Sequence, residues 1–177
     1  MRVGVLAGVN FSNVHSSNGT TSENGDSQTG FLGGVFTQYQ FSDGFYFEPQ
    51  LRYAQKGAGA VDLDYLELPL YAKYKFMTGN AFMPHVFVGP TVAYRIGASA
   101  GGVSNDAVSD SFKSFDLSID AGIGAEFAAT ESMNLGISAA YQFGLLNILD
   151  GAAQTASPNT TSKNRGFNLY ATASWAY

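Results

Sequence analysis

The residues in this chain that could do chemistry are two histidines and a set of charged side chains that recur at alternate positions. His15 stands beside Ser16 and Ser17, and Asp62 lies in another polar segment. A histidine, a serine and a carboxylate can act as base, nucleophile and orienting acid when a fold brings them together, which would suit acyl transfer from a lipid. Nothing in the spacing brings these groups together. We therefore expect His15 to be a solvated loop residue and the chain not to be an enzyme.

The charged residues share one face of segments whose other face is apolar. They are Arg2, Glu48, Arg52, Glu67, Lys73, Lys75, His85, Arg95, Asp116, Asp120 and Glu126. Charges on an enclosed face need partners of opposite sign. We therefore expect an interior plug of ion pairs, with amide side chains between them: Gln38, Gln40, Gln50 and Gln142.

One antiparallel register supplies such partners for two neighbouring segments. If Arg52 faces Glu67, then Glu48 lies diagonal to Lys73. Residues opposite or diagonal on one face of an antiparallel pair are close enough to interact.

A second register pairs the next two segments. If Arg95 faces Asp116, the same register sets His85 opposite Glu126. A histidine near one end of the interior could act as a proton-sensitive gate. We favour the simpler interpretation that His85 is a hydrogen-bonded residue of the plug.

Composition excludes several classes of function. The chain has no cysteine and two histidines, so it lacks the ligands for a transition-metal site, and we expect neither metal nor cofactor. Its nine Lys and Arg are scattered and its formal net charge is −5, so nucleic acid is not an expected partner. It also lacks a run of about 18 apolar residues, which excludes a transmembrane helix.

Eight segments alternate apolar and polar residues with a period of two, which predicts β-strands with two unlike faces. They are residues 2–12, 30–41, 45–55, 63–76, 82–97, 114–127, 134–145 and 167–177. Short turns at 42–44, 77–81 and 128–133 alternate with the long polar loops 13–29, 98–113 and 146–163 and the shorter loop 57–62. Each strand can cross a bilayer, and long loops on one rim with short turns on the other are typical of outer-membrane barrels.

The aromatic residues of the apolar face are sorted by height. Near the short turns we expect Phe41, Phe45, Phe47, Tyr74, Phe76, Phe82, Phe127, Trp175 and Tyr177. Near the long loops we expect Phe11, Phe31, Tyr53, Tyr94, Phe115, Phe143 and Phe167. Two aromatic girdles around an aliphatic band are expected where rings sit at both membrane interfaces, and a soluble barrel has no reason to sort its residues in this way.

These patterns predict an all-β fold: an eight-stranded antiparallel up-and-down transmembrane β-barrel with a polar interior, as a single domain over residues 1–177. We expect it in the bacterial outer membrane with both termini periplasmic. We also expect Met1 to be an added start residue on a mature domain or the remnant of a trimmed longer chain, because an exported protein needs a signal peptide. Pro49, Pro69, Pro84 and Pro90 fall inside predicted strands, where bulges or unpaired strand ends could accommodate them.

Three segments resemble the PorT-like outer-membrane β-barrel proteins of the Bacteroidota. They are YLELPLYAKY at 65–74, VGPTVAY at 88–94 and FEPQLRY at 47–53 followed by QKG at 55–57, although Pro49 and Gln50 make the last match imperfect. The resemblance runs along nearly the whole chain from Val3. It implies a small barrel of the OmpA and OmpX type and no catalytic residues, and we do not transfer the role in protein secretion of the family's named member.

The expected role is structural or surface-binding, through mobile extracellular loops and without catalysis. Two alternatives remain open at this stage: a narrow channel or secretion-associated component, and a soluble barrel that binds lipid inside. Expected partners of the monomer are outer-membrane lipid and the barrel-insertion machinery, which would recognise the last strand through Trp175 and Tyr177. A surface ligand or secretion component would be a further partner.

Overall fold

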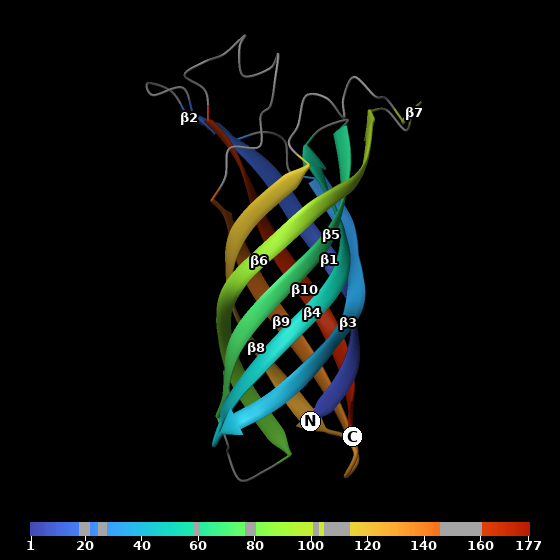
Figure 1. Cartoon of the computed structure of the whole chain (residues 1–177), viewed down its shortest axis with the longest axis vertical. Helices are drawn as coiled ribbons and strands as arrows, with labels where there is room; N and C mark the ends of the chain where they lie inside the picture. Colours follow the sequence, from blue (N-terminus) through green and yellow to red (C-terminus); the bar gives the residue numbers. More distant parts are fainter. Residues whose placement is uncertain are drawn as a thin grey trace.

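Eight long antiparallel strands follow one another around a barrel in the computed structural model of the chain (Figure 1). The structure describes residues 1–17, 22–24, 28–58, 61–76, 81–100, 103–104, 114–145 and 161–177. The long strands are β1 (Arg2–Ser17), β3 (Gln28–Ser42), β4 (Phe45–Ala58), β5 (Val61–Lys75), β6 (Phe82–Ala100), β8 (Phe115–Ala128), β9 (Met133–Gly144) and β10 (Thr161–Ala176). Two short strands, β2 (Ser22–Asn24) and β7 (Val103–Ser104), pair with the ends of β1 and β6.

The barrel closes where the first strand meets the last. β1 pairs with β10 over its whole length, from Arg2 opposite Ala176 to Ser17 opposite Thr161. Closure leaves no long strand with an unpaired edge, which is the condition for a sheet to cross a bilayer. Both termini lie at the end of the barrel that carries the short turns (Figure 1). Within the described residues, no helix has the length and apolarity needed to span a membrane.

The strands continue further towards the loop end than the alternation predicted. β1 runs to Ser17 and β10 begins at Thr161, in segments that we expected to be loop. The reason is that the backbone ladder between these strands continues through serine, threonine and asparagine residues, which break the apolar alternation but not the pairing. The central parts of the three predicted long loops lie outside the described residues.

Three of the four strand prolines lie at gaps in the ladders rather than at bulges. β3 pairs with β4 up to Phe36 opposite Gln50 and resumes, in the same register, at Tyr39 opposite Phe47, so the ladder opens around Pro49. The β4–β5 and β5–β6 ladders open in the same way around Pro69 and Pro90. Proline has no backbone N–H, so a gap in the ladder at a proline leaves no unpaired N–H at that residue.

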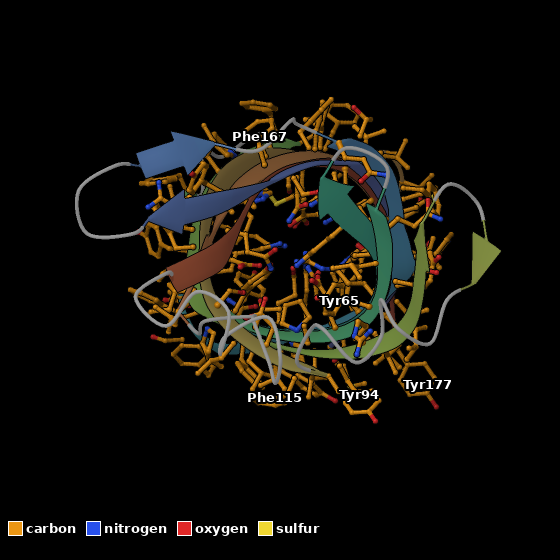
Figure 2. The ribbon with its side chains drawn as sticks, turned by 90° about the horizontal axis from the view of Figure 1, so that it is seen from above. Tyr65, Tyr94, Phe115, Phe167 and Tyr177 are labelled. Atoms are coloured by element: carbon orange, nitrogen blue, oxygen red, sulfur yellow. The ribbon has the colours of Figure 1, made fainter. Side chains whose placement is uncertain are left out.

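The two faces of the sheet carry different side chains, as Figure 2 shows from the loop end. Phe115, Tyr94 and Phe167 point away from the barrel, whereas Tyr65 points into it (Figure 2). The interior is not wholly polar, however. A buried cluster of apolar and aromatic side chains shares it with the charges: Leu6, Leu32, Phe36, Ala54, Tyr71, Phe87, Ala140 and Tyr170.

The outward aromatic residues gather at the two ends of the strands. Near the short turns, the ring of Tyr74 lies 4.7 Å from that of Phe45 and 4.9 Å from that of Phe76. At the loop end, Phe11 and Phe167 lie 6.4 Å apart on paired strands. Each member of the two predicted girdles is exposed except Tyr53 and Tyr74, which are half-buried. Tyr39 and Tyr141 are further exposed rings on this face.

Candidate functional site: the charged interior of the barrel

The eleven charged or histidine side chains predicted to point inward occupy the lumen and its two mouths. Nine of them are buried: Glu48, Arg52, Glu67, Lys73, Lys75, His85, Asp116, Asp120 and Glu126. Arg2 and Arg95 are half-buried, and they lie near opposite ends of the barrel. Arg2 donates from Nε to Ser174 Oγ over 3.2 Å and from Nη2 to the carbonyl of Ser132 over 2.8 Å, which fixes it at the short-turn mouth.

One group of ion pairs, which we call the central cluster, is made by Arg52, Lys56, Glu67 and Asp120. Arg52 Nε lies 2.6 Å from Glu67 Oε2, and Arg52 Nη2 lies 3.1 Å from Asp120 Oδ2. Lys56 pairs with the other oxygen of Glu67. The side chains of Arg52, Glu67 and Asp120 have no exposed area, so each charge relies on the others rather than on solvent.

Hydroxyl groups complete the shell around Asp120. It accepts hydrogen bonds from Tyr71 over 2.7 Å, Thr91 over 2.9 Å and Ser118 over 3.3 Å. Tyr71 also accepts one from Arg52 Nη1 over 3.2 Å. With the guanidinium group, Asp120 thus has four donors, which is what a buried carboxylate requires.

A second group, which we call the short-turn cluster, is made by Glu48, Lys73, Lys75 and Glu126. Lys73 pairs with Glu48 and lies 3.6 Å from Glu126 Oε1, while Lys75 Nζ lies 2.6 Å from Glu126 Oε2. Like the central cluster, it contains two acids and two cations. Each group is therefore formally neutral, which lowers the cost of enclosing the charges.

Amide side chains tie the short-turn cluster together. Gln38 Nε2 donates to Glu48 over 2.6 Å and to Glu126 over 3.0 Å, while its oxygen accepts from Lys75 over 2.8 Å. Gln50 donates to Glu48 over 2.9 Å.

Some of these contacts cross the lumen. Gln38 on β3 and Glu126 on β8 have three long strands between them in either direction around the barrel, and so do Lys56 on β4 and Gln142 on β9. A direct hydrogen bond between such strands is possible only across the lumen. An eight-stranded barrel has an interior that side chains can fill, and here they do so at two heights.

The predicted register between the fifth and sixth segments is wrong by two residues. Asp116 lies opposite Ala93 instead of Arg95, and His85 lies opposite Gly124 instead of Glu126. Asp116 accepts a hydrogen bond from the backbone N–H of Leu117 over 2.8 Å. His85 Nε2 lies 3.1 Å from Ser138 Oγ.

Ring size explains the observed register. A Cβ placed on Gly124 would lie 2.5 Å from His85 Nε2, and one on Gly122 would lie 2.3 Å from the ring of Phe87. The two rings therefore need glycine opposite them. A slip of two residues preserves which face each side chain occupies, so alternation could not distinguish the registers. A glycine opposite each of the two rings is the sequence feature that distinguishes these registers.

Two further details of the plug differ from expectation. Gln40 is exposed, because it lies at the short-turn mouth of the barrel, where it lines the same pocket as Arg2 and Lys75. Lys56 is buried in the interior in addition to the predicted charges, and it continues the even-numbered positions of Glu48 and Arg52 along the same strand. The residues considered for catalysis have their backbones in strands: His15, Ser16, Ser17 and Asp62. Their side chains are outside what the structure describes, and so is the triad that they could form.

Chemically, this arrangement balances charge and fills space. Within the described part of the chain, no group of three His, Cys, Asp or Glu side chains could hold a metal ion. A pocket of about 360 Å³ opens at the short-turn mouth, next to Arg2, Gln38, Tyr46 and Lys75.

Comparisons with known proteins agree with this architecture. The sequence model of the family described as "Outer membrane protein beta-barrel domain" matches residues 1–150. The fold is similar to that of Neisserial surface protein A, with a TM-score of 0.60 and 19% identity over 99% of this chain and 97% of that one. It is also similar to OprG from Pseudomonas aeruginosa (TM-score 0.53, 14% identity, 99% and 96% covered) and to the outer membrane enzyme PagL (0.52, 14%, 92% and 97%). A search of curated proteins found no match.

Proposed function

From the premise that this chain belongs to the family of outer membrane protein β-barrel domains, we propose that it is a closed, non-catalytic barrel with a structural or surface-binding role. Its body anchors the loop end in the bacterial outer membrane and does not conduct. The observation that carries this proposal is the pair of neutral ion clusters whose contacts cross the lumen. The outward apolar face and inward charges are also the reverse of what a soluble lipid carrier needs.

The proposed orientation has both termini and the short turns in the periplasm, and the loop end outside the cell. An even number of long strands returns the chain to the side from which it starts. We further propose that the barrel is monomeric and belongs to the PorT-like branch of the family, which the motifs at 65–74 and 88–94 favour.

The first experiment combines gel mobility and conductance. The protein is refolded into detergent micelles and run on SDS gels with and without boiling, then reconstituted into a planar lipid bilayer. We expect a heat-dependent mobility shift and no steady ionic current. A folded, heat-modifiable protein that conducts steadily would overturn the closed plug and favour the narrow-channel or secretion-associated alternative.

An enzymatic role has one specific test. PagL is described as an enzyme, but at 14% identity its likeness to this chain concerns the fold alone. We expect no acyl release when the purified barrel is incubated with lipid A or phospholipid. Activity that disappears in His15→Ala would contradict the non-catalytic proposal.

The barrel-insertion machinery is the proposed assembly partner, and it would recognise Trp175 on the outer side of β10 and Tyr177, which follows that strand. Tyr177 is 96% exposed and Trp175 is 41% exposed, so neither ring is needed for the interior. We expect Tyr177→Asp to reduce the fraction of protein assembled in cells, whereas Tyr177→Phe keeps the ring and assembles normally. Equal assembly of both variants would contradict this role.

A further inference from the structure

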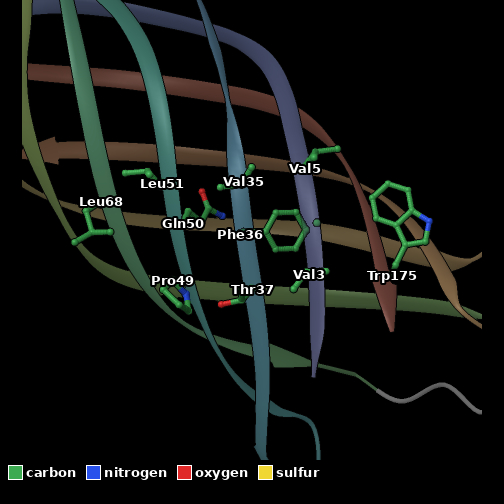
Figure 3. A pocket seen from close by; sticks show the side chains of 11 residues that line it. Val3, Val5, Val35, Phe36, Thr37, Pro49, Gln50, Leu51, Leu68 and Trp175 are labelled. Atoms are coloured by element: carbon green, nitrogen blue, oxygen red, sulfur yellow. The ribbon is translucent and has the colours of Figure 1, made fainter. Parts of the chain in front are cut away.

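The outer surface of the barrel has an apolar groove of about 480 Å³ that runs across β1, β3 and β4. Its walls are the outward side chains of Val3, Val5, Val35, Leu51, Leu68 and Trp175 (Figure 3). Trp175 on β10 lies at one end and Leu68 on β5 at the other (Figure 3). We call this feature the outer groove.

The groove exists because of a local departure from the regular sheet. The β3–β4 ladder opens around Thr37 and Pro49, both of which line the groove. These two residues are small, whereas the next outward positions towards the short turns hold Tyr39 and Phe47. The barrel surface is therefore hollowed where rings would otherwise continue the aromatic band.

The position of the groove identifies what covers it. Val5, Val35 and Leu51 are each about half-exposed, at 49%, 53% and 48%, in the aliphatic zone between the aromatic bands. This zone of an outer-membrane barrel faces lipid hydrocarbon. Val3 and Trp175 lie close to the strand ends at the two termini, so the groove belongs to the short-turn half of the barrel.

We propose that the outer groove is a binding site for one acyl chain of a phospholipid from the leaflet on the short-turn side. This inference rests on the proposed orientation, in which that leaflet is the periplasmic one, built from phospholipid rather than lipopolysaccharide. A chain laid in the groove contacts apolar walls on two sides, while a chain against the convex surface contacts one. The groove volume of about 480 Å³ is in the range of small-molecule sites.

Trp175 makes the proposal measurable, because it is the single tryptophan in the chain. The refolded protein in excess non-ionic detergent is titrated with a phosphatidylcholine whose acyl chains are brominated at mid-chain, and quenching of tryptophan fluorescence is recorded. The test variant is Val35→Phe, which adds a ring in the middle of the groove. The matched control is Val9→Phe, at an outward position that does not line the groove.

For the native protein and Val9→Phe we expect quenching that saturates at one lipid per barrel. For Val35→Phe we expect binding about tenfold weaker, since a ring that displaces about two methylenes costs that factor. Unsaturated quenching proportional to the lipid-to-detergent ratio, equal in all three proteins, would mean that lipid only surrounds the barrel and would overturn the site. Tighter binding of lipid A than of the phospholipid in a competition titration would overturn the assignment to the phospholipid leaflet.

Gel mobility and conductance, measured on the same protein, distinguish failure of the groove site from failure of the proposed function. A heat-modifiable, non-conducting barrel with unsaturated quenching refutes the groove site alone. A protein that conducts refutes the closed plug whether or not the groove binds lipid. Quenching that is lost on concentrating the protein, with a larger species in sedimentation, would show a second copy in the groove and would also overturn the lipid proposal.

Discussion

The central cluster and the short-turn cluster each neutralise two buried acids, but with different residues. Each encloses two acids and two cations, but the central cluster is organised by one guanidinium group and the short-turn cluster by two lysines and two amides. Arg52 bonds in fixed directions to Glu67, Asp120 and the hydroxyl of Tyr71 at once. A lysine ammonium group is a compact point charge without a rigid fork of donors. A neighbouring lysine can therefore take over part of its ion pairing.

The two clusters are almost equally enclosed. The Arg52, Glu67 and Asp120 side chains have no exposed area, and the side chain of Lys75, which lines the pocket at the short-turn mouth, is 2% exposed. The contacts make the difference: Arg52 bonds to both acids of the central cluster, whereas in the short-turn cluster Glu126 faces two lysines. Three substitutions test this contrast.

The largest effect is expected from Arg52→Leu. It removes the guanidinium partner of two buried acids at once, and breaking a buried pair on one side costs about 3–5 kcal/mol. Urea unfolding in phospholipid vesicles, followed by Trp175 fluorescence and gel mobility, measures the loss. Lys75→Leu is the matched variant in the short-turn cluster, with an expected loss of about 1.5 kcal/mol. Equal losses would show that the two clusters do not differ as we infer.

An intermediate effect is expected from Glu126→Gln. This change removes the acid that faces both Lys73 and Lys75. It keeps an acceptor oxygen for only one of Gln38 and Asn134, which donate to different oxygens of Glu126. Because Glu48 still pairs with Lys73, we expect a loss of about 2 kcal/mol in the free energy of unfolding. Glu131→Gln, on an exposed turn, serves as the control and should leave the urea midpoint unchanged. A loss as large as that of Arg52→Leu would mean that charge is not shared in this cluster.

The smallest effect is expected from Tyr71→Phe. The variant keeps the ring against Phe87 but removes one of the donors to Asp120, which retains Arg52, Thr91 and Ser118. A loss of about 1 kcal/mol is expected in the same urea titration. Tyr46→Phe, which keeps the ring beneath Lys75, should change stability by less than about 0.5 kcal/mol. If Tyr46→Phe is the more damaging of the two, the central cluster is not the more demanding one.

Much of the architecture could be read from the alternation of residue types. The segment from Phe45 to Gln55 already separates Phe47, Leu51 and Tyr53 from Glu48 and Arg52, and the structure places these groups on opposite faces of β4. Alternation could not locate the ends of β1 and β10, whose polar residues keep the ladder going by backbone hydrogen bonds alone. It also gave no sign of the buried apolar cluster around Phe36 and Phe87, because pointing inward does not require a residue to be polar.

The sequence by itself determined that this chain forms a closed antiparallel barrel with apolar residues outside and charges inside, because a strand has a period of two and each residue type favours one environment. It also determined that Arg52 can face Glu67, since both lie on neighbouring strands joined by a short loop. Only the tertiary structure decided that Arg52 reaches Asp120 and that Gln38 reaches Glu126. Those contacts depend on the curvature and stagger of the whole barrel, which bring distant strands within reach across the lumen and which no single pair of strands encodes.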